Sequence, residues 1–246
     1  DGEHFEGGVA RIAHSCALPG LDAEGIFTHF AVSDEPGEEN EAYTRRQFAL
    51  FCRVIDALAA KGCTFALRHC ANSGAVAYYP DTWLDMVRPG ILLYGLTEMA
   101  EELGLKSVMS LKTCVSTIKT YEPGVTISYG RLFTTQRRTR VGVLPIGYAD
   151  GFFRTFSNRF RVMTEDGPAP ILGRICMDMC MIDLTECPHV GVGSTIEIFG
   201  RHNSVNAMAR MADTIPYELV CAVSKRVPRL YCRDGKVVGR KLWIEE

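Results

Sequence analysis

The sequence carries almost no excess of charge of either sign. Its 27 Lys and Arg residues and 29 Asp and Glu residues are mixed along 246 residues, so the net charge is −2. A nucleic-acid-binding protein gathers positive charge in a patch, and a membrane-surface protein carries a polybasic segment. We therefore expect no nucleic-acid partner and no electrostatic attachment to a membrane.

Long apolar runs are also missing. A membrane-spanning helix needs about 18 or more consecutive apolar residues, and no run in the sequence reaches that length. With no signal peptide, the cysteines indicate reduced thiols in a cytoplasmic protein rather than a disulfide framework. The ten cysteines lie scattered in apolar stretches, at Cys16, Cys52, Cys63, Cys70, Cys114, Cys176, Cys180, Cys187, Cys221 and Cys232.

A metal-binding pattern is missing too. Cys176 and Cys180 have no second close pair and no histidine at the spacing of a zinc site, so we expect no metal. What remains is an ordinary globular composition, 47% hydrophobic. The chain is long enough for one large core or two smaller ones.

The first part of the chain, residues 1–104, alternates between strand-like and helical patterns. Apolar runs of strand length occur at 25–31 and 64–69, and residues 85–94 suggest a third strand interrupted at Pro89-Gly90. Strands that alternate with helices predict right-handed βαβ units and a parallel sheet. Ligand-binding groups then collect at the carboxyl ends of the strands.

Helical patterns fill the gaps between these runs. Residues 1–8 lack apolar periodicity and suggest a loop, residues 9–17 suggest a short helix, and 72–73 begin another short helix. From residue 41 a longer helix is predicted, because apolar residues recur at helical spacing. They are Phe48, Phe51, Ile55 and Leu58.

The pattern changes near residue 105. The segments that resemble strands are 107–121, 140–146, 160–164, 175–184 and 195–199. They are separated by turns, so residues 105–246 predict a mostly antiparallel β domain. Two short helices near 205–212 and 217–226 and a late hairpin turn at residues 233–236 complete it.

Six short motifs occur in order along the chain. Together they resemble the pyridoxal-phosphate-dependent alanine racemases over nearly its whole length. They are Thr28-His29-Phe30-Ala31, His69-Cys70-Ala71-Asn72-Ser73, Arg88-Pro89-Gly90-Ile91, Ser128-Tyr129-Gly130 with Gly147-Tyr148-Ala149-Asp150-Gly151, Gly173-Arg174-Ile175-Cys176-Met177-Asp178, and Thr214-Ile215-Pro216-Tyr217.

The resemblance implies a partial (β/α) TIM-type barrel, residues 1–104, followed by the family's C-terminal β domain, residues 105–246. It also implies that the first third of the family's length, with its Schiff-base lysine, has no match here. The seven lysines all stand in other contexts: Lys61, Lys106, Lys112, Lys119, Lys225, Lys236 and Lys241.

Racemisation needs two bases on opposite faces of the α-carbon and a cofactor that delocalises the carbanion. By the resemblance, Tyr129 is one base, and His29 and Arg88 favour its phenolate form, because an unassisted phenol has a pKa near ~10. Arg88 also faces the pyridine nitrogen of the cofactor and keeps it unprotonated.

The remaining roles are likewise implied by the resemblance. The cofactor phosphate is held by Ser73, by the backbone amides of Gly90 and Ile91, and by the hydroxyl of Tyr217, with Asn72 as a support. For the substrate, the Met177 amide binds the carboxylate and Tyr148 lines the entrance. The access corridor is matched by Asp34, Arg154, Arg174 and Ile215, although surface ion pairing explains the three charged residues equally well; Asp150 and Asp178 are turn or support residues.

The implied function is interconversion of L- and D-alanine, for peptidoglycan precursors, by a head-to-tail homodimer that shares its active sites. Three alternatives stay open. One is a serine-accepting racemase domain of the resistance type, and another is a non-catalytic remnant of a racemase, which the missing lysine favours. The third is a barrel-plus-β protein in which the motif residues only pack. For the chain alone, we expect no activity.

Overall fold

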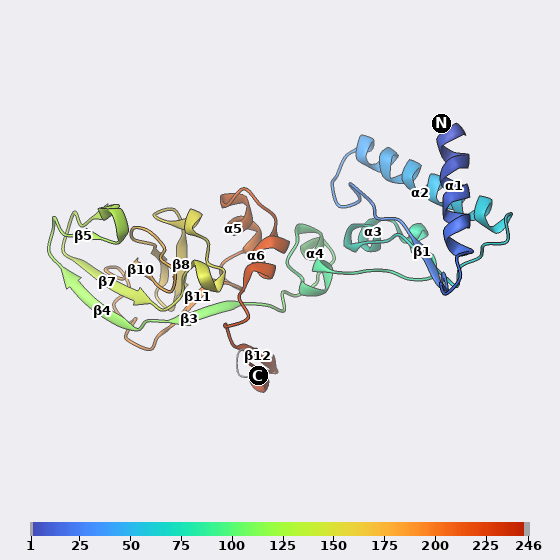
Figure 1. The fold of residues 1–246 in the computed structure, drawn as a ribbon. Coiled ribbons are helices and arrows are strands. Elements are labelled where there is room, and N and C mark those ends of the chain that lie inside the picture. The colour runs from blue at the N-terminus through green and yellow to red at the C-terminus, as the bar shows by residue number, and fades with distance from the viewer. Residues whose placement is uncertain (1, 244–246) are drawn as a thin grey trace. The chain divides into compact units, whose positions relative to one another are not determined.

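A computed structural model describes residues 2–243, and it divides into two compact units, Asp1–Lys106 (unit 1) and Ser107–Glu246 (unit 2). In Figure 1, unit 1 runs from blue to green-blue and unit 2 from green to red. Unit 1 combines helices with two parallel strands, and unit 2 is mostly antiparallel β. The fold class predicted from the sequence, α/β followed by antiparallel β, is confirmed.

The chain begins with a longer helix than the sequence suggested. Helix α1 spans Gly2–Cys16, so the expected loop at residues 1–8 is wrong from residue 2 onward; residue 1 lies outside the described range. Val9 is 1% exposed, and the Arg53 guanidinium lies 4.8 Å from the centroid of the Phe5 ring. These contacts with the rest of unit 1 stabilise a helix that glycine-rich local sequence alone would not favour.

Helix α2 (Glu38–Ala59) is the predicted long helix. Phe51 and Leu58 are buried, and Phe48 and Ile55 pack against the core of unit 1. Its other faces carry charge, and no helix within residues 2–243 is long and apolar enough to cross a membrane.

The sheet of unit 1 has two parallel strands, β1 (Gly25–Phe27) and β2 (Leu67–His69). The expected third strand at 85–94 is wrong. Its amides at Asp85 and Arg88 do donate to β2 and the residues after it, but Pro89 has no N–H to continue a ladder. The segment turns there and enters a 3₁₀ helix, Ile91–Tyr94.

Two short helices complete unit 1. Helix α3 (Ser73–Tyr78) begins directly after β2, and the Asn72 side chain caps it by accepting the Ala75 N–H. Helix α4 (Glu98–Glu102) is capped in the same way by Thr97. Side-chain oxygens at these positions satisfy amides that a helix start leaves unpaired.

Unit 2 contains two larger antiparallel sheets, ordered β10-β7-β4 and β3-β11-β8-β9. The strands are β3 (Leu111–Cys114), β4 (Thr117–Tyr121), β7 (Thr139–Leu144), β8 (Arg161–Thr164), β9 (Gly167–Pro170), β10 (Cys180–Asp183) and β11 (Thr195–Phe199). Leu144, Ile182, Val162 and Ile196 are fully buried, so each sheet turns an apolar face inward.

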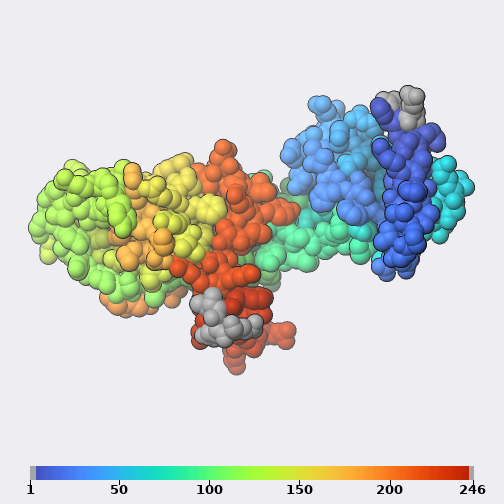
Figure 2. All heavy atoms as spheres, viewed as in Figure 1, coloured from blue at the N-terminus to red at the C-terminus, as the bar shows by residue number. Residues whose placement is uncertain are grey.

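Smaller elements surround these sheets. Strands β5 (Thr126–Ile127), β6 (Phe133–Thr134) and β9 were missed from sequence, because they are short and lack a clear alternation. The two predicted helices are present as α5 (Val205–Met211) and α6 (Pro216–Ala222). The predicted late turn joins β12 (Arg229–Arg233) to β13 (Lys236–Lys241) in a hairpin that projects from unit 2 (Figures 1 and 2).

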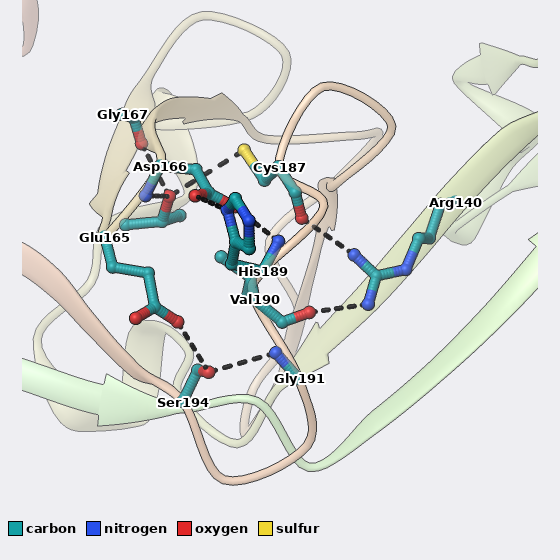
Figure 3. Close-up of polar contacts among 10 residues, drawn as sticks. Arg140, Glu165, Asp166, Gly167, Cys187, His189, Val190, Gly191 and Ser194 are labelled. Atoms are coloured by element: carbon teal, nitrogen blue, oxygen red, sulfur yellow. Dashed lines mark hydrogen bonds and ion pairs between the residues drawn. The ribbon is translucent and has the colours of Figure 1, made fainter.

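Polar contacts fix the turn between β8 and β9 (Figure 3). The Asp166 carboxylate accepts the His189 backbone N–H and pairs with His189 Nδ1, both at 2.8 Å. The Arg140 guanidinium donates to the backbone oxygens of Cys187 and Val190, and Ser194 Oγ donates to the Glu165 carboxylate. This network ties the loop that leads into β11 to the turn.

Candidate active site

One guanidinium group joins the carboxyl ends of the two strands in unit 1. Arg88 Nη2 lies 3.2 Å from His29 Nδ1, and Nη1 lies 2.5 Å from His69 Nδ1. Nη2 also donates to the backbone oxygens of Thr28 and Cys70, at 3.2 and 3.4 Å. Among the side chains described, no carboxylate pairs with Arg88, and its Nε–H has no acceptor. The guanidinium is therefore held without a carboxylate, and its Nε–H and one Nη1–H have no acceptor among these side chains.

His69 belongs to one of the sequence motifs, but no role was predicted for it. Its ring stacks on Phe27, with centroids 5.3 Å apart, and the Arg88 guanidinium lies 5.5 Å from the centroid of the same Phe27 ring. Burial, and then the nearby Arg88 charge, lower the pKa of His69. A neutral imidazole with an unprotonated Nδ1 can accept from Arg88, so His69 helps to orient the guanidinium.

The same geometry fixes the tautomer of His29. Because Arg88 donates to His29 Nδ1, the neutral ring must carry its proton on Nε2. His29 can then donate a hydrogen bond to another group from its Nε2–H. Arg88 and His29 therefore form a directional chain of two donors.

A small polar cradle lies at the start of α3. Ser73 is 3% exposed, and its Oγ accepts the amides of Gly90 at 2.9 Å and Leu92 at 3.4 Å. Leu92, rather than Ile91, thus makes the second contact to the hydroxyl. A Cβ at Gly90 would lie 3.8 Å from Ser73 Oγ, so a side chain there would fill the space in front of the hydroxyl. Because its oxygen accepts both amides, the Ser73 hydroxyl keeps its own O–H to donate, as a phosphate oxygen requires.

Asn72 supports this cradle without facing it. Its Oδ1 caps α3 and also accepts the Ser33 hydroxyl at 2.7 Å. A Cβ at Gly74 would approach the Asp34 backbone N to 2.7 Å, so glycine allows the loop at 33–34 to pack on α3. This places Asp34 beside the helix that begins with Ser73.

In unit 2, Tyr129 lies on a turn with unusual backbone geometry. Ser128, Gly130 and Arg131 all have positive φ, at 69°, 71° and 54°. For Ser128 and Arg131 this conformation is strained, and such strain persists only where the surroundings hold it. The Tyr129 side chain is 72% exposed within unit 2, so the turn presents the phenol outward.

A cavity of about 510 Å³ opens beside this turn. Its lining includes Tyr129 and three further residues that the sequence singled out, Tyr148, Arg154 and Arg174. The full lining is Tyr129, Gly130, Tyr148, Arg154, Arg174, Ile175 and Cys176. Two guanidinium groups and two phenols suit a small anionic ligand, because both groups donate hydrogen bonds.

Tyr148 and Met177 lie on two turns that touch. The amides of Tyr148 and Ala149 donate to the backbone oxygens of Cys176 and Met177, both at 3.0 Å. A Cβ at Gly147 would approach Cys176 O to 2.2 Å, so only glycine permits this contact. Within the described part of the chain, the Met177 N–H donates no hydrogen bond and is available to a ligand.

Other predicted residues of unit 2 stand apart from the cavity lining. Tyr217 is the second residue of α6 and is 37% exposed, and Ile215 precedes that helix and is 58% exposed. Asp150 and Asp178 make structural contacts, as expected of support residues. Within residues 2–243 no group of three or more His, Cys, Asp or Glu side chains is placed to hold a metal ion.

Known proteins match both units. The family model "Alanine racemase, N-terminal domain" matches residues 3–98, and "Alanine racemase, C-terminal domain" matches residues 108–231. The alanine racemase of Desulforamulus reducens is 45% identical over 231 residues, which are 92% of this chain and 62% of that protein. The alanine racemase of Clostridium tetani is 41% identical and covers 96% of this chain and 62% of its own length.

Solved structures agree with these sequence matches. The alanine racemase of Clostridium difficile 630, in complex with cycloserine, has a TM-score of 0.89 at 36% identity and covers 97% of this chain and 64% of that one. The alanine racemase of Bacillus anthracis with bound L-Ala-P has a TM-score of 0.85 at 33% identity, over 92% and 60%. The chain thus spans about three fifths of the length of these relatives. By sequence and by fold, it belongs to the alanine racemase family.

Proposed function

We propose that this chain forms the larger part of an alanine racemase that uses pyridoxal phosphate to interconvert L- and D-alanine. The observation that carries the proposal is the bonding of Arg88. Its guanidinium is held by His29 and His69 with no carboxylate among the described side chains, and its Nε–H is left free. An arginine so placed is a donor that cannot give up its proton, opposite a cofactor nitrogen that must stay unprotonated.

The cradle of unit 1 would hold the cofactor phosphate. Ser73 would donate its O–H, and the Gly90 amide, which donates to Ser73 Oγ, would turn to the phosphate. By the family resemblance we also assign the Ile91 amide and the Tyr217 hydroxyl to this group. When bound, pyridoxal phosphate supplies an electron sink for the α-carbanion. Arg88 would limit that sink, because it would keep the ring nitrogen neutral, and would so restrict side reactions.

Tyr129 would accept the α-proton on one face of the substrate. It needs a neighbour that favours phenolate, and by the family resemblance we assign that role to the pair of His29 and Arg88. The Met177 amide would bind the substrate carboxylate, and Tyr148 would line the entrance. Arg154, Arg174, Asp34 and Ile215 would form the access corridor.

The second base would come from outside these 246 residues. None of the seven lysines stands in the family's Schiff-base context, and none contacts Arg88 or Ser73 within the described residues. We place the active form in a head-to-tail homodimer, in which Tyr129 and Met177 serve the partner's cofactor. Cytoplasmic D-alanine supply for peptidoglycan is the role that fits such an enzyme.

The experiment compares two preparations with pyridoxal phosphate and L-alanine. The 246-residue chain alone should form no D-alanine, whereas the chain combined with a lysine-bearing barrel segment from a relative should form it. D-alanine from the chain alone would overturn the assignment of the second base. Absence of D-alanine from a reconstituted, cofactor-loaded dimer would instead favour a non-catalytic remnant, and a faster rate with L-serine would favour the serine-accepting alternative.

A further inference from the structure

We infer that Arg226 is a positioning residue that sets the spacing between the Tyr148 turn and the Met177 turn, and thereby the carboxylate-binding geometry of the site. The inference rests on the proposed function for the roles of Tyr148 and Met177. Arg226 touches neither substrate-facing group; it acts through Asp150 and Asp178.

The contacts of Arg226 reach both turns at once. Nε donates to Asp150 Oδ1 at 2.7 Å, and Nη2 donates to Asp178 Oδ1 at 2.6 Å. Asp150 closes the turn that begins at Tyr148, and Asp178 follows Met177 directly. A guanidinium has donors at fixed positions and can bridge two carboxylates, whereas a lysine ammonium cannot reproduce that fork.

Asp150 also makes a hydrogen bond within its own turn. Its second oxygen, Oδ2, accepts the Gly147 N–H at 2.9 Å, and the side chain is only 12% exposed. Asp150 is thus held on one side by the turn and on the other by Arg226. Loss of the guanidinium would leave this largely buried carboxylate without its charged partner, and the turn would reorganise to hydrate it.

The segment that contains Arg226 packs against the Tyr148 turn. The Ser224 amide donates to the Asp150 backbone oxygen at 3.2 Å. A Cβ at Gly151, where φ is 98°, would approach the Ala222 oxygen to 2.5 Å. This segment follows α6, which begins with Pro216 and Tyr217, so Arg226 lies on a stretch of chain that packs against the Tyr148 turn.

The Arg226 guanidinium stays charged over the working range of pH. Hydrogen bonds to Asp150 and then to Asp178 raise the pKa of the Arg226 guanidinium above its ordinary value. The role we assign to Arg226 is geometric: in the described part of the chain the Met177 N–H donates to no other group, so its direction depends on the position of the turn that Asp178 helps to hold.

The first test uses the 246-residue chain and does not depend on activity. Hydrogen–deuterium exchange is followed by mass spectrometry for wild type, Arg226→Met, Arg226→Lys and the control Lys225→Ala, which removes a neighbouring exposed charge. We expect faster exchange of the amides at 147–151 and 176–179 in Arg226→Met, partial recovery in Arg226→Lys, and no change in Lys225→Ala. Unchanged exchange at both turns in Arg226→Met would overturn the inference.

The second test uses an active dimer that contains this sequence. Arg226→Met should raise KM for alanine roughly tenfold or more, as expected when a hydrogen bond to a charged group is lost, with a smaller change in kcat. A purely structural role would lower the amount of folded enzyme but leave KM unchanged, and that result would also overturn the inference. An inactive wild-type dimer would instead count against the proposed function, while the exchange experiment would still decide whether Arg226 braces the turns.

Discussion

The Ser128 side chain and the Arg174 backbone hold each other through two hydrogen bonds. Ser128 Oγ accepts the Arg174 N–H at 2.9 Å and donates to the Arg174 oxygen at 2.8 Å. A Cβ at Gly173 would approach the Ser128 Cβ to 2.5 Å, so the two segments are as close as glycine allows. This latch explains how Ser128 keeps a φ of 69° and how the adjacent Tyr129 is held.

Removing the latch should therefore destabilise unit 2. Ser128→Ala leaves the Arg174 amide unpaired in a partly buried place and leaves its carbonyl with only the weak Cys176 thiol donor, which costs about 1–3 kcal/mol. Urea unfolding followed by circular dichroism measures the loss, with Ser107→Ala, an exposed serine of the same unit, as the control. Equal stability of Ser128→Ala and wild type would show that the latch contributes nothing.

Gly147→Ala should be poorly tolerated. The added methyl group would meet the backbone oxygens of Cys176 and Met177, at 2.2 and 2.4 Å, and backbone atoms cannot rotate away. We expect a loss of about 1–3 kcal/mol in the free energy of unfolding. Gly191→Ala is the matched control, because nothing lies within 4 Å of its added Cβ and its φ is not positive; if both variants unfold alike, the close approach of the two turns is not real.

The pair formed by His189 and Asp166 should make stability depend on pH. Its hydrogen bond to Asp166 raises the pKa of His189 above 6.5, so the stabilisation from His189 is complete below 6.5 and lost as pH rises through the higher folded value. The reciprocal bond lowers the pKa of Asp166 below 3.8, so its contribution is complete above 3.8 and lost as pH falls through the lower folded value. Both contributions are therefore present between pH 3.8 and 6.5.

Thermal unfolding across this range checks the prediction. The Tm difference between wild type and His189→Ala should be largest between pH 3.8 and 6.5 and should shrink at higher pH. Its size should be modest, since the His189 side chain is 80% exposed. In an Asp166→Asn background the difference should lose this pH dependence, and a constant difference in both backgrounds would contradict the assigned pair.

Local patterns in the sequence predicted the elements whose apolar faces repeat regularly. The face of α2 and the Asp234-Gly235 turn were recognisable, because helical spacing and turn residues act within a few positions. Of α1, the part from residue 9 onward was predicted as a short helix, but its start at Gly2 was not, since the glycines near it disfavour a helix locally. The prediction of a third strand was wrong because Pro89 lacks the N–H that a ladder of hydrogen bonds needs at that position.

The candidate site could also be predicted only in part. Motifs identified Tyr129, Tyr148, Arg154 and Arg174, which the fold gathers around one cavity. They did not reveal that His69 orients Arg88, because that contact depends on the pairing of two strands. The positive φ of Ser128 was equally hidden, since serine does not signal a left-handed conformation.

The most direct test of the account is the effect of Tyr129→Phe on an active dimer that contains this sequence, measured as exchange of the α-proton of alanine in deuterated water. Only the proton-accepting oxygen is removed, so racemisation should fall by orders of magnitude, while the visible absorption of the bound cofactor stays in place. Near-normal exchange of both L- and D-alanine in Tyr129→Phe would contradict the assignment of Tyr129 as a base.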